Sequence, residues 1–222
     1  MAGRVPIHDT RPRSRYAAGL PAITAERIVD EALRLTEEHG LENWTLRQLA
    51  AAVEAYPAVV YHHVGDREAV AAAVLDRVAG MIPLPPAALP WRDWFRVLLG
   101  ELRVVLRRYP GTARRLAARG PGVERAAPIA DRGVALLREA GFGTESVLAH
   151  TTLLGTACQF IATEDDRGAE VHRADPAATG EFAHDIAEHP ESVPGFFAGF
   201  YDYVVERTLD GMAARLARIR ET

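Results

Sequence analysis

The chain has 222 residues and a mass of 24.2 kDa, enough for one large domain or a small domain joined to a larger one. Apolar residues make up 48% of it and charged residues 25%, which is ordinary for a soluble globular protein. The sequence has neither an uninterrupted apolar stretch of about 18 residues nor a hydrophobic N-terminal run, which argues against a membrane span and a secretory signal. Cys158 is the single cysteine, so an internal disulfide and a multi-cysteine metal site are excluded. We therefore expect a cytoplasmic protein.

The composition also favours one class of fold. All 26 basic residues are arginines, and alanine occupies 39 positions. Both are strong helix formers, so we expect an all-α fold. The net charge of −4 is unevenly distributed, because residues 1–20 carry four arginines against one acid while residues 160–222 carry six arginines against 13 acids. The overall charge therefore does not decide whether the protein binds nucleic acid.

The first part of the chain predicts a flexible arm followed by a small helical head. Residues 1–22 are polar and punctuated by arginine and proline, without periodicity, and predict the arm. Residues 23–81 predict a long helix, two short helices and an alanine-rich helix. Residues that cap, start or stop helices mark their ends: Thr24, Gly40, Thr45, Pro57, Asp66 and Gly80. The proline-rich residues 82–90 cannot be helical and predict a connector.

Residues 91–222 predict a larger helical domain. The pattern of apolar residues predicts helices at 91–108, 110–119, 122–140, 144–164 (capped by Thr144), from Asp175, and 193–218. The expected architecture is therefore an N-terminal three-helix head and a larger C-terminal helical domain on either side of the connector.

The layout of the head points to DNA. A long helix and two short helices joined by a tight turn form the helix-turn-helix layout, whose second short helix enters the major groove. Periodicity alone leaves open three structural helices with no role on DNA. The stretches 45–50 (TLRQLA) and 60–70 (VYHHVGDREAV) resemble the tetracycline-repressor (TetR) family of transcriptional regulators. That family's pattern is T-x-R-x-(I/L)-A, then L-Y-x-H-F and K/R-x-x-L, and the resemblance covers about residues 24–70.

The resemblance implies a set of residues that contact DNA. Arg47 would reach into the groove, where a guanidinium can bind guanine O6 and N7. Tyr61, His63 and Arg67 would contact phosphates, which fix the register on DNA without reading its sequence. For Tyr61, a place in the core is the alternative. The full set is Thr45, Arg47, Gln48, Tyr56, Pro57, Ala58, Tyr61, His62, His63 and Arg67.

Two residues depart from the family pattern. Glu54 stands at the turn between the short helices, where the family usually has glycine, and Tyr56 stands where it usually has a serine or threonine cap. A non-glycine residue in a left-handed turn costs up to about 2 kcal/mol. A missing cap costs about 1 kcal/mol. An alternative function follows, in which the protein no longer reads a specific operator and acts as a ligand- or protein-binding dimer.

The C-terminal domain resembles the regulatory domain of the same family in the number and lengths of its helices. The resemblance implies a homodimer in which the helices at 144–164 and 193–218 form a four-helix bundle with the partner. Both helices are apolar on more than one face, which ordinary intramolecular packing also explains. Candidate interface residues are Val147, Leu153, Phe160, Ile161, Phe197, Phe200, Tyr201 and Val204.

A ligand pocket is expected between the helix at 91–108 and those at 123–140 and 144–164. Its candidate walls, any of which could be plain core, are Trp94, Leu98, Leu102, Val105, Leu137, His150, Leu154 and Cys158. The crowded acids 164–166 could attract a cation or form a solvated turn.

The sequence offers no enzyme-like constellation. We find no nucleophile beside a base, no paired carboxylates, no metal cluster and no phosphate-binding glycine loop, so we expect neither an enzyme nor a cofactor. The expected function is a homodimeric DNA-binding transcriptional regulator. We expect a repressor that binds a palindromic operator and is released by a small, largely apolar effector.

Overall fold

The computed structural model describes residues 22–119, 123–170 and 193–221, with the backbone alone for 167–170 and 193–198. Every regular element in these ranges is a helix, which confirms the all-α fold. The main helices are α1 (Ala25–His39), α2 (Leu46–Ala52), α3 (Pro57–His63), α4 (Arg67–Ala79), α5 (Trp91–Arg108), α6 (Thr112–Arg119), α7 (Ala127–Leu137), α8 (Ser146–Glu170) and α10 (Val193–Arg220). The expected arm, apart from its last residue, and the helix expected from Asp175 lie outside the described residues.

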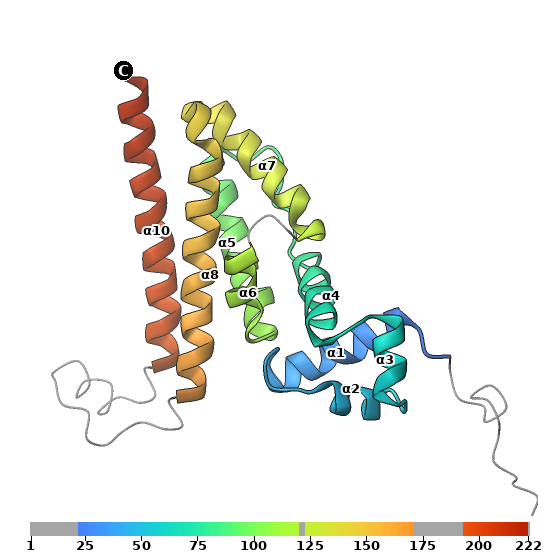
Figure 1. Cartoon of the computed structure of the whole chain (residues 1–222). Helices are drawn as coiled ribbons and strands as arrows, with labels where there is room; N and C mark the ends of the chain where they lie inside the picture. Colours follow the sequence, from blue (N-terminus) through green and yellow to red (C-terminus); the bar gives the residue numbers. More distant parts are fainter. Residues whose placement is uncertain (1–21, 120–122, 171–192, 222) are drawn as a thin grey trace, which may run out of the picture.

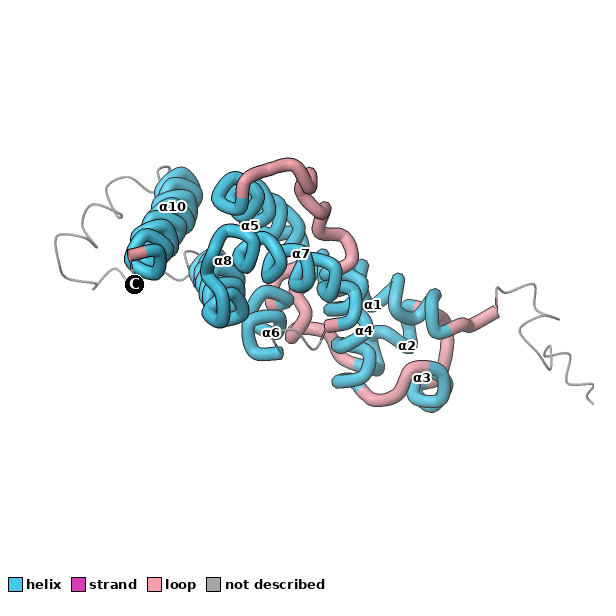
Figure 2. The backbone as a smooth tube through the Cα atoms, turned by 90° about the horizontal axis from the view of Figure 1, so that it is seen from above, coloured by secondary structure: helices cyan, strands magenta, loops and turns pink. Residues whose placement is uncertain are grey.

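The molecule consists of a small group of helices, α1 to α4, and a larger group, α5 to α10. We call them the head and the body. Figures 1 and 2 show α10 at one edge of the molecule and α1 to α3 at the opposite edge. In the body, α8 packs against α5, α6, α7 and α10, and so lies at its centre.

Capping residues fix the helix starts of the head as expected. The Thr24 hydroxyl accepts a hydrogen bond from the backbone N–H of Arg27 at 3.2 Å, and Asp66 accepts one from Ala69 at 2.8 Å. Thr45 forms a reciprocal capping box with Gln48. These bonds satisfy backbone N–H groups that a helix start leaves without partners.

The body departs from expectation around α7 and α8. The helix expected from Thr144 begins two residues later, at Ser146, and continues past residue 164 to Glu170. Left-handed glycines interrupt the chain before it, with φ of 110° at Gly141 and 57° at Gly143. The short segments η3 (Arg138–Phe142) and η4 (Gly143–Glu145) therefore replace regular α-helix between α7 and α8, and a third short segment, η2 (Glu124–Ala126), precedes α7.

The head has a small core in which the buried polar groups shown here are paired. Trp44 is 1% exposed, and its indole N–H donates to the Thr36 hydroxyl at 3.0 Å. That hydroxyl donates to the carbonyl of Ala32 at 2.7 Å. Leu49 and Val60 bring α2 and α3 onto the same core. The two short helices are thereby held in a fixed relative orientation.

A close backbone approach joins the head to the body. Leu41, in the loop after α1, is fully buried, and its N–H donates to the carbonyl of Pro110 at 2.8 Å. Gly111, with φ of 87°, lies so near that a Cβ there would stand 3.3 Å from the Leu41 Cβ. We call this contact of Gly40 and Leu41 with Pro110 and Gly111 the seam.

The turn between α2 and α3 confirms the departure seen in the sequence. Among the described residues, Glu54 is the one non-glycine residue with a left-handed φ, 55°. Tyr56 stands at the N-cap of α3 without a side-chain capping bond, and Pro57 opens the helix. The strain expected from the sequence is therefore present in the backbone.

Replacing Glu54 by glycine should stabilise the protein. The left-handed conformation costs an ordinary residue about 1–2 kcal/mol, and the greater freedom of glycine in the unfolded chain offsets about 0.4–1 kcal/mol of the gain. We expect the free energy of unfolding, from urea denaturation, to rise by about 1 kcal/mol. Glu54→Ala keeps the Cβ and should show no such rise. An equal rise in both variants would assign the cost to the glutamate side chain instead.

Candidate DNA interface and ligand pocket

The two short helices present an exposed surface at the far end of the head. Figure 1 shows α2 and α3 on the side of the head away from the body. A tight turn joins them, in which the Ala55 N–H donates to the carbonyl of Ala50 at 2.8 Å. Most of the residues proposed to contact DNA are exposed here: Thr45, Arg47, Gln48, Tyr56, Pro57, Ala58, Tyr61, His62 and His63.

Tyr61 is not a core residue. Its side chain is 61% exposed, whereas its neighbour Val60 is fully buried and fills the position under α3. Tyr56 is 82% exposed. Two aromatic side chains thus lie on the outer surface of the head at α3, and the described part of the chain leaves most of their surface uncovered.

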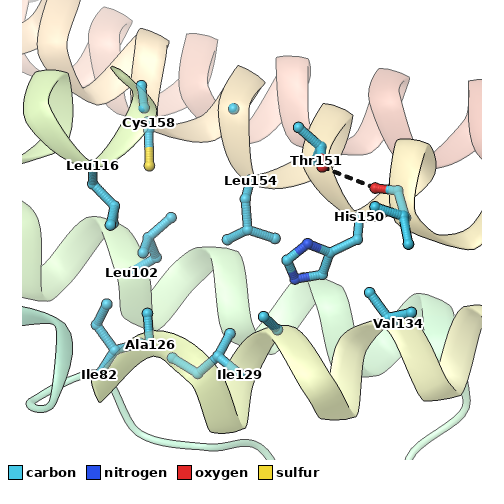
Figure 3. A pocket seen from close by; sticks show the side chains of 14 residues that line it. Ile82, Leu102, Leu116, Ala126, Ile129, Val134, His150, Thr151, Leu154 and Cys158 are labelled. Carbon is cyan, nitrogen blue, oxygen red and sulfur yellow. Dashed lines mark hydrogen bonds between the residues drawn. The ribbon is translucent and has the colours of Figure 1, made fainter. Parts of the chain in front are cut away.

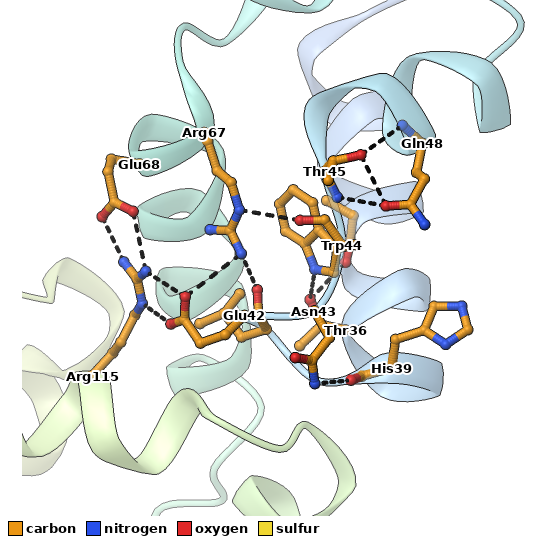
Figure 4. Close-up of polar contacts among 12 residues, drawn as sticks. Thr36, His39, Glu42, Asn43, Trp44, Thr45, Gln48, Arg67, Glu68 and Arg115 are labelled. Atoms are coloured by element: carbon orange, nitrogen blue, oxygen red, sulfur yellow. Dashed lines mark hydrogen bonds and ion pairs between the residues drawn. The ribbon is translucent and has the colours of Figure 1, made fainter.

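Arg67 differs from the expectation that it faces DNA phosphates. Its side chain is only 24% exposed, and the guanidinium carbon lies 4.2 Å from the centre of the Trp44 ring. It donates to the carbonyl of Trp44 at 3.3 Å and to the carbonyl of Leu41, as Figure 4 shows. The loop between α1 and α2 offers backbone oxygens that the sequence pattern does not reveal. Arg67 therefore braces this loop in the structure.

A cluster of charged side chains connects this loop to the body. Arg115 on α6 donates to Glu42 at 2.6 and 3.0 Å and to Glu68 at 2.6 and 3.1 Å (Figure 4). The carboxylate of Glu42 also lies 3.7 Å from Arg67. Hydrogen bonds from Arg115 lower the pKa of both Glu42 and Glu68, so both are ionised at neutral pH. We call Arg115, Glu42 and Glu68 the Arg115 bridge.

A pocket of about 820 Å³, including its open mouth, lies in the body. Figure 3 shows side chains of α7 and α8 facing one another across it. Its lining residues are Ile82, Leu102, Leu116, Ala117, Ala126, Ile129, Ala130, Val134, Val147, His150, Thr151, Leu154, Gly155 and Cys158.

The structure corrects half of the predicted pocket walls. Leu102, His150, Leu154 and Cys158 line the pocket, but Trp94, Leu98, Val105 and Leu137 do not. Of these, Trp94, Leu98 and Leu137 are fully buried and Val105 packs against the same core. Helical periodicity identifies the apolar face of a helix, and it does not show which part of that face is left uncovered.

Sequence reasoning missed the contribution of α6 and of the connector. Leu116 and Ala117 come from α6, and Ile82 from the connector. The α6 segment is short and carries three arginines, so its apolar residues gave a weak signal. It nevertheless forms a pocket wall and carries Arg115.

His150 is an unusual side chain for this apolar pocket. Burial lowers the pKa of its imidazole, so the ring is neutral at pH 7. The Nε2 atom is buried without a hydrogen-bond partner in the described chain. By contrast, the Thr151 hydroxyl donates to the carbonyl of Val147 at 2.9 Å. Burial also raises the pKa of the Cys158 thiol to about 12, which favours a packing role over a redox role.

The acidic cluster at 164–166 is neither a cation site nor a solvated turn. Glu164 is 6% exposed and accepts two hydrogen bonds of 3.1 Å from Arg103 on α5. Asp165 accepts one from the N–H of Gly111 at 3.0 Å and lies 3.5 Å from Arg107. Burial raises the pKa of Asp165 to about 6. These acids fasten α8 to the loop that forms the body side of the seam.

Several residues expected in a dimer interface are buried within the single chain. Leu153, Ile161 and Tyr201 are at most 2% exposed, so they have almost no surface to contribute to a partner. Phe160 and Phe200 pack on each other across α8 and α10, with ring centres 5.3 Å apart.

The remaining interface candidates are less buried. Val204 is half-buried, Val147 is 55% exposed beside the pocket, and the side chain of Phe197 lies outside the described residues. Leu148 and Tyr203, which are not among the candidates, are 68% and 60% exposed on α8 and α10.

Comparison with known proteins shows which proteins this chain is similar to. The family described as "Bacterial regulatory proteins, tetR family" matches residues 28–74. An HTH-type transcriptional regulator of Saccharopolyspora erythraea is 33% identical over 130 residues, which are 58% of this chain and 55% of that protein. The matching region thus spans about half the length of that relative.

Solved structures share the fold over most of the chain. ActR of Streptomyces coelicolor, in complex with actinorhodin, has a TM-score of 0.68 and 23% identity, covering 89% of this chain and 98% of its own. BioQ with its double-stranded DNA operator has a TM-score of 0.61 and 21% identity, covering 66% and 90%. The fold is thus that of helix-turn-helix regulators with a helical C-terminal domain. Residues 28–74 thus match the tetR family of bacterial regulatory proteins, and most of the chain shares the fold of ActR.

No helix in the described parts of the chain is long and apolar enough to cross a membrane.

Asp165→Asn should change how stability depends on pH. The folded carboxyl has a pKa of about 6 against 3.8 for the ordinary group, so the folded state binds more protons between these values. This carboxyl therefore lowers stability as the pH rises from about 4 to above 6. Asparagine keeps an acceptor for Gly111 without the buried charge. We expect wild type and variant to be similar at pH 4 and the variant to be about 1–3 kcal/mol more stable at pH 7.5.

Urea denaturation at the two pH values measures this difference. The matched control is Asp166→Asn, because Asp166 is 56% exposed and pairs with Arg114 at the surface. Its effect should be below about 0.5 kcal/mol at both pH values. A variant at Asp165 that is less stable than wild type at pH 7.5 would show that the ion pair with Arg107 outweighs the burial of charge.

Proposed function

We propose that this protein is a homodimeric transcriptional repressor that binds a palindromic operator and is released by a small, largely apolar effector. One observation carries the proposal: α6 supplies a wall of the pocket through Leu116 and Ala117 and, through Arg115, holds the head. A ligand site and a helix-turn-helix thus share one short helix. We assign the head to residues 23–81, the connector to 82–90 and the regulatory and dimerisation domain to 91–222. No enzymatic activity is part of the proposal.

The DNA side of the proposal rests on the exposed surface of α2 and α3. Arg47 is exposed in the first turn of α2, and the aromatic Tyr56 and Tyr61 are exposed on α3. Phosphate contacts position such a head, and contacts to base edges in the major groove give it specificity. That the similarly folded BioQ was solved with a DNA operator supports the same role here.

The coupling between pocket and DNA would run through contacts at both ends of α4. The Arg115 bridge reaches Glu68 in its first turn, and the N–H of Arg125 donates to Asp76 near its end at 2.9 Å. A ligand changes operator affinity only if it binds one arrangement of the heads more tightly than the other. A ligand that displaces α6 would tilt α4 and change the separation of the two heads. By linkage, operator DNA would weaken ligand binding by the same factor.

A second candidate function is favoured by the turn between α2 and α3. Glu54 is strained and Tyr56 leaves the start of α3 uncapped. A head with this turn could have lost specific reading of an operator, which would leave a ligand- or protein-binding dimer. The DNA experiment below separates the two functions.

Arg47→Ala should weaken specific binding to DNA. The test compares a duplex from the upstream region of the protein's own gene with a random duplex of equal length. We expect a loss of about 1–3 kcal/mol on the upstream duplex and little change on the random one, because a groove-reading guanidinium contributes specificity. Fluorescence anisotropy at a fixed salt concentration measures both affinities.

The control is Arg34→Ala, which removes the same charge from an exposed position on α1 that is paired with Glu31 and Glu38. It should leave the preference for the upstream duplex unchanged. If Arg47→Ala weakens both duplexes equally, Arg47 is a phosphate contact. If wild type shows no preference for the upstream duplex, the second candidate function is supported.

The proposed dimer should appear in solution. Sedimentation equilibrium at micromolar concentration is expected to give twice the chain mass of 24.2 kDa. Leu148, Thr152 and Gln159 are exposed and share one face of α8, which we propose as part of the interface. Leu148→Glu should therefore favour the monomer.

Leu84→Glu places the same charge at a half-exposed leucine of the connector and should remain dimeric. A monomeric wild type would exclude the palindromic operator, because two heads must bind half-sites about one DNA turn apart.

A further inference from the structure

The chemistry of the pocket walls limits what the pocket can bind. Its walls are almost wholly aliphatic, and none of the lining residues is charged. Without its open mouth the pocket measures about 160 Å³, of the order of an apolar cavity that holds a small aromatic molecule. A charged ligand would lose its hydration without gaining a partner among these residues, which is costly. The walls therefore select for an uncharged, mainly apolar compound.

His150 is the exception in the lining. Figure 3 shows its ring projecting from α8 into the space between α8 and α7. The Thr151 hydroxyl already donates to its own helix, whereas Nε2 of His150 has no partner in the described chain. Burying a ring nitrogen without such a partner costs free energy.

The position of the ring is fixed by its neighbours. A Cβ at Gly133 on α7 would stand 2.7 Å from Cδ2 of His150 and 3.2 Å from Nε2, so the ring lies directly on the glycine. The ring of Phe95 on α5 packs against it edge to face, with centres 6.0 Å apart. Nε2 is thus the ring nitrogen held against α7, and Nδ1, on the other edge of the ring, is the nitrogen left to hydrogen-bond a molecule in the pocket.

The neutral ring limits what can bond to it. A neutral imidazole has one donor nitrogen and one acceptor nitrogen. A hydroxyl group can donate and accept, so it pairs with whichever nitrogen faces it. We propose that the pocket takes an uncharged, mainly apolar small molecule bearing a hydroxyl group, and that this hydroxyl hydrogen-bonds to the imidazole of His150. The inference deepens the proposed function and rests on it for the role of the pocket.

Three small aromatic probes test the chemistry: 2-naphthol, 2-methylnaphthalene and 2-naphthoate. They share a ring system and differ in carrying a hydroxyl, a methyl or a carboxylate group. The full-length protein is titrated with each at pH 7.5, and binding is followed by fluorescence. We expect 2-naphthol to bind about fivefold to tenfold more tightly than 2-methylnaphthalene, as one hydrogen bond allows. The carboxylate should bind more weakly than either.

His150→Leu keeps a side chain of similar length and removes the hydrogen bond. In this variant we expect the preference for 2-naphthol over 2-methylnaphthalene to disappear. Thr151→Val is the matched control, because it removes the neighbouring polar group, whose bond stays within α8, and it should keep the preference. Addition of 2-naphthol should also shift the ring signals of His150 in a nitrogen-15 spectrum that resolves the histidines.

Several outcomes would overturn the inference. They are equal binding of 2-naphthol and 2-methylnaphthalene to wild type, tighter binding of 2-naphthoate, an unchanged preference in His150→Leu, or no binding of any probe. Operator affinity without a probe is measured on the same samples. If His150→Leu retains wild-type operator affinity, a negative probe result counts against the hydroxyl contact alone. The DNA-binding role is then judged separately from its own experiment.

Discussion

The orientation of the head depends on its contact with the body, which has an apolar part, the seam, and a charged part, the Arg115 bridge. Leu41 is buried completely at the seam, and Arg115 closes the adjoining polar side by binding Glu42 and Glu68. Both carboxylates are more than half exposed, so neither ion pair alone would contribute much stability. Their value is geometric, because one guanidinium on α6 holds the loop before α2 and the first turn of α4 together. Any movement of α6 is therefore transmitted to both.

The central helix α8 connects the remaining parts. One face lines the pocket, another packs on α5 and α10, and a third, with Leu148, is exposed. Near its end, Glu164 and Asp165 are fastened to Arg103 and to the backbone of Gly111. A helix with this many partners cannot shift without cost. The pocket consequently has one wall that is held firmly, formed by α8, and another formed by the short α6. The Arg115 bridge would transmit movement of α6 to the head.

Most of the fold could be predicted from the sequence because its signals are local. Thr24, Thr45 and Asp66 cap helices where they were expected to, and Glu54 adopts the left-handed conformation that its place in the pattern required. The errors concern contacts between distant segments. Arg67 is turned inward by carbonyl groups that lie more than 20 residues away, and the pocket walls depend on which apolar residues another helix leaves uncovered. No local pattern encodes these contacts. The residues proposed to contact DNA remain a prediction of the sequence pattern.

The rate at which a thiol reagent modifies the single cysteine can report how often the structure around the pocket opens. Cys158 is 2% exposed, and its thiol remains protonated when buried, so a thiol reagent can attack it only while the surrounding helices separate. With no other thiol in the chain, the rate of modification reports one event, the opening of the structure around this residue. The opening frequency of the pocket can therefore be read in the intact protein without a fluorescent label or an engineered substitution. A compound that occupies the cavity should slow the modification of Cys158. Binding can therefore be detected even when the compound has not been identified.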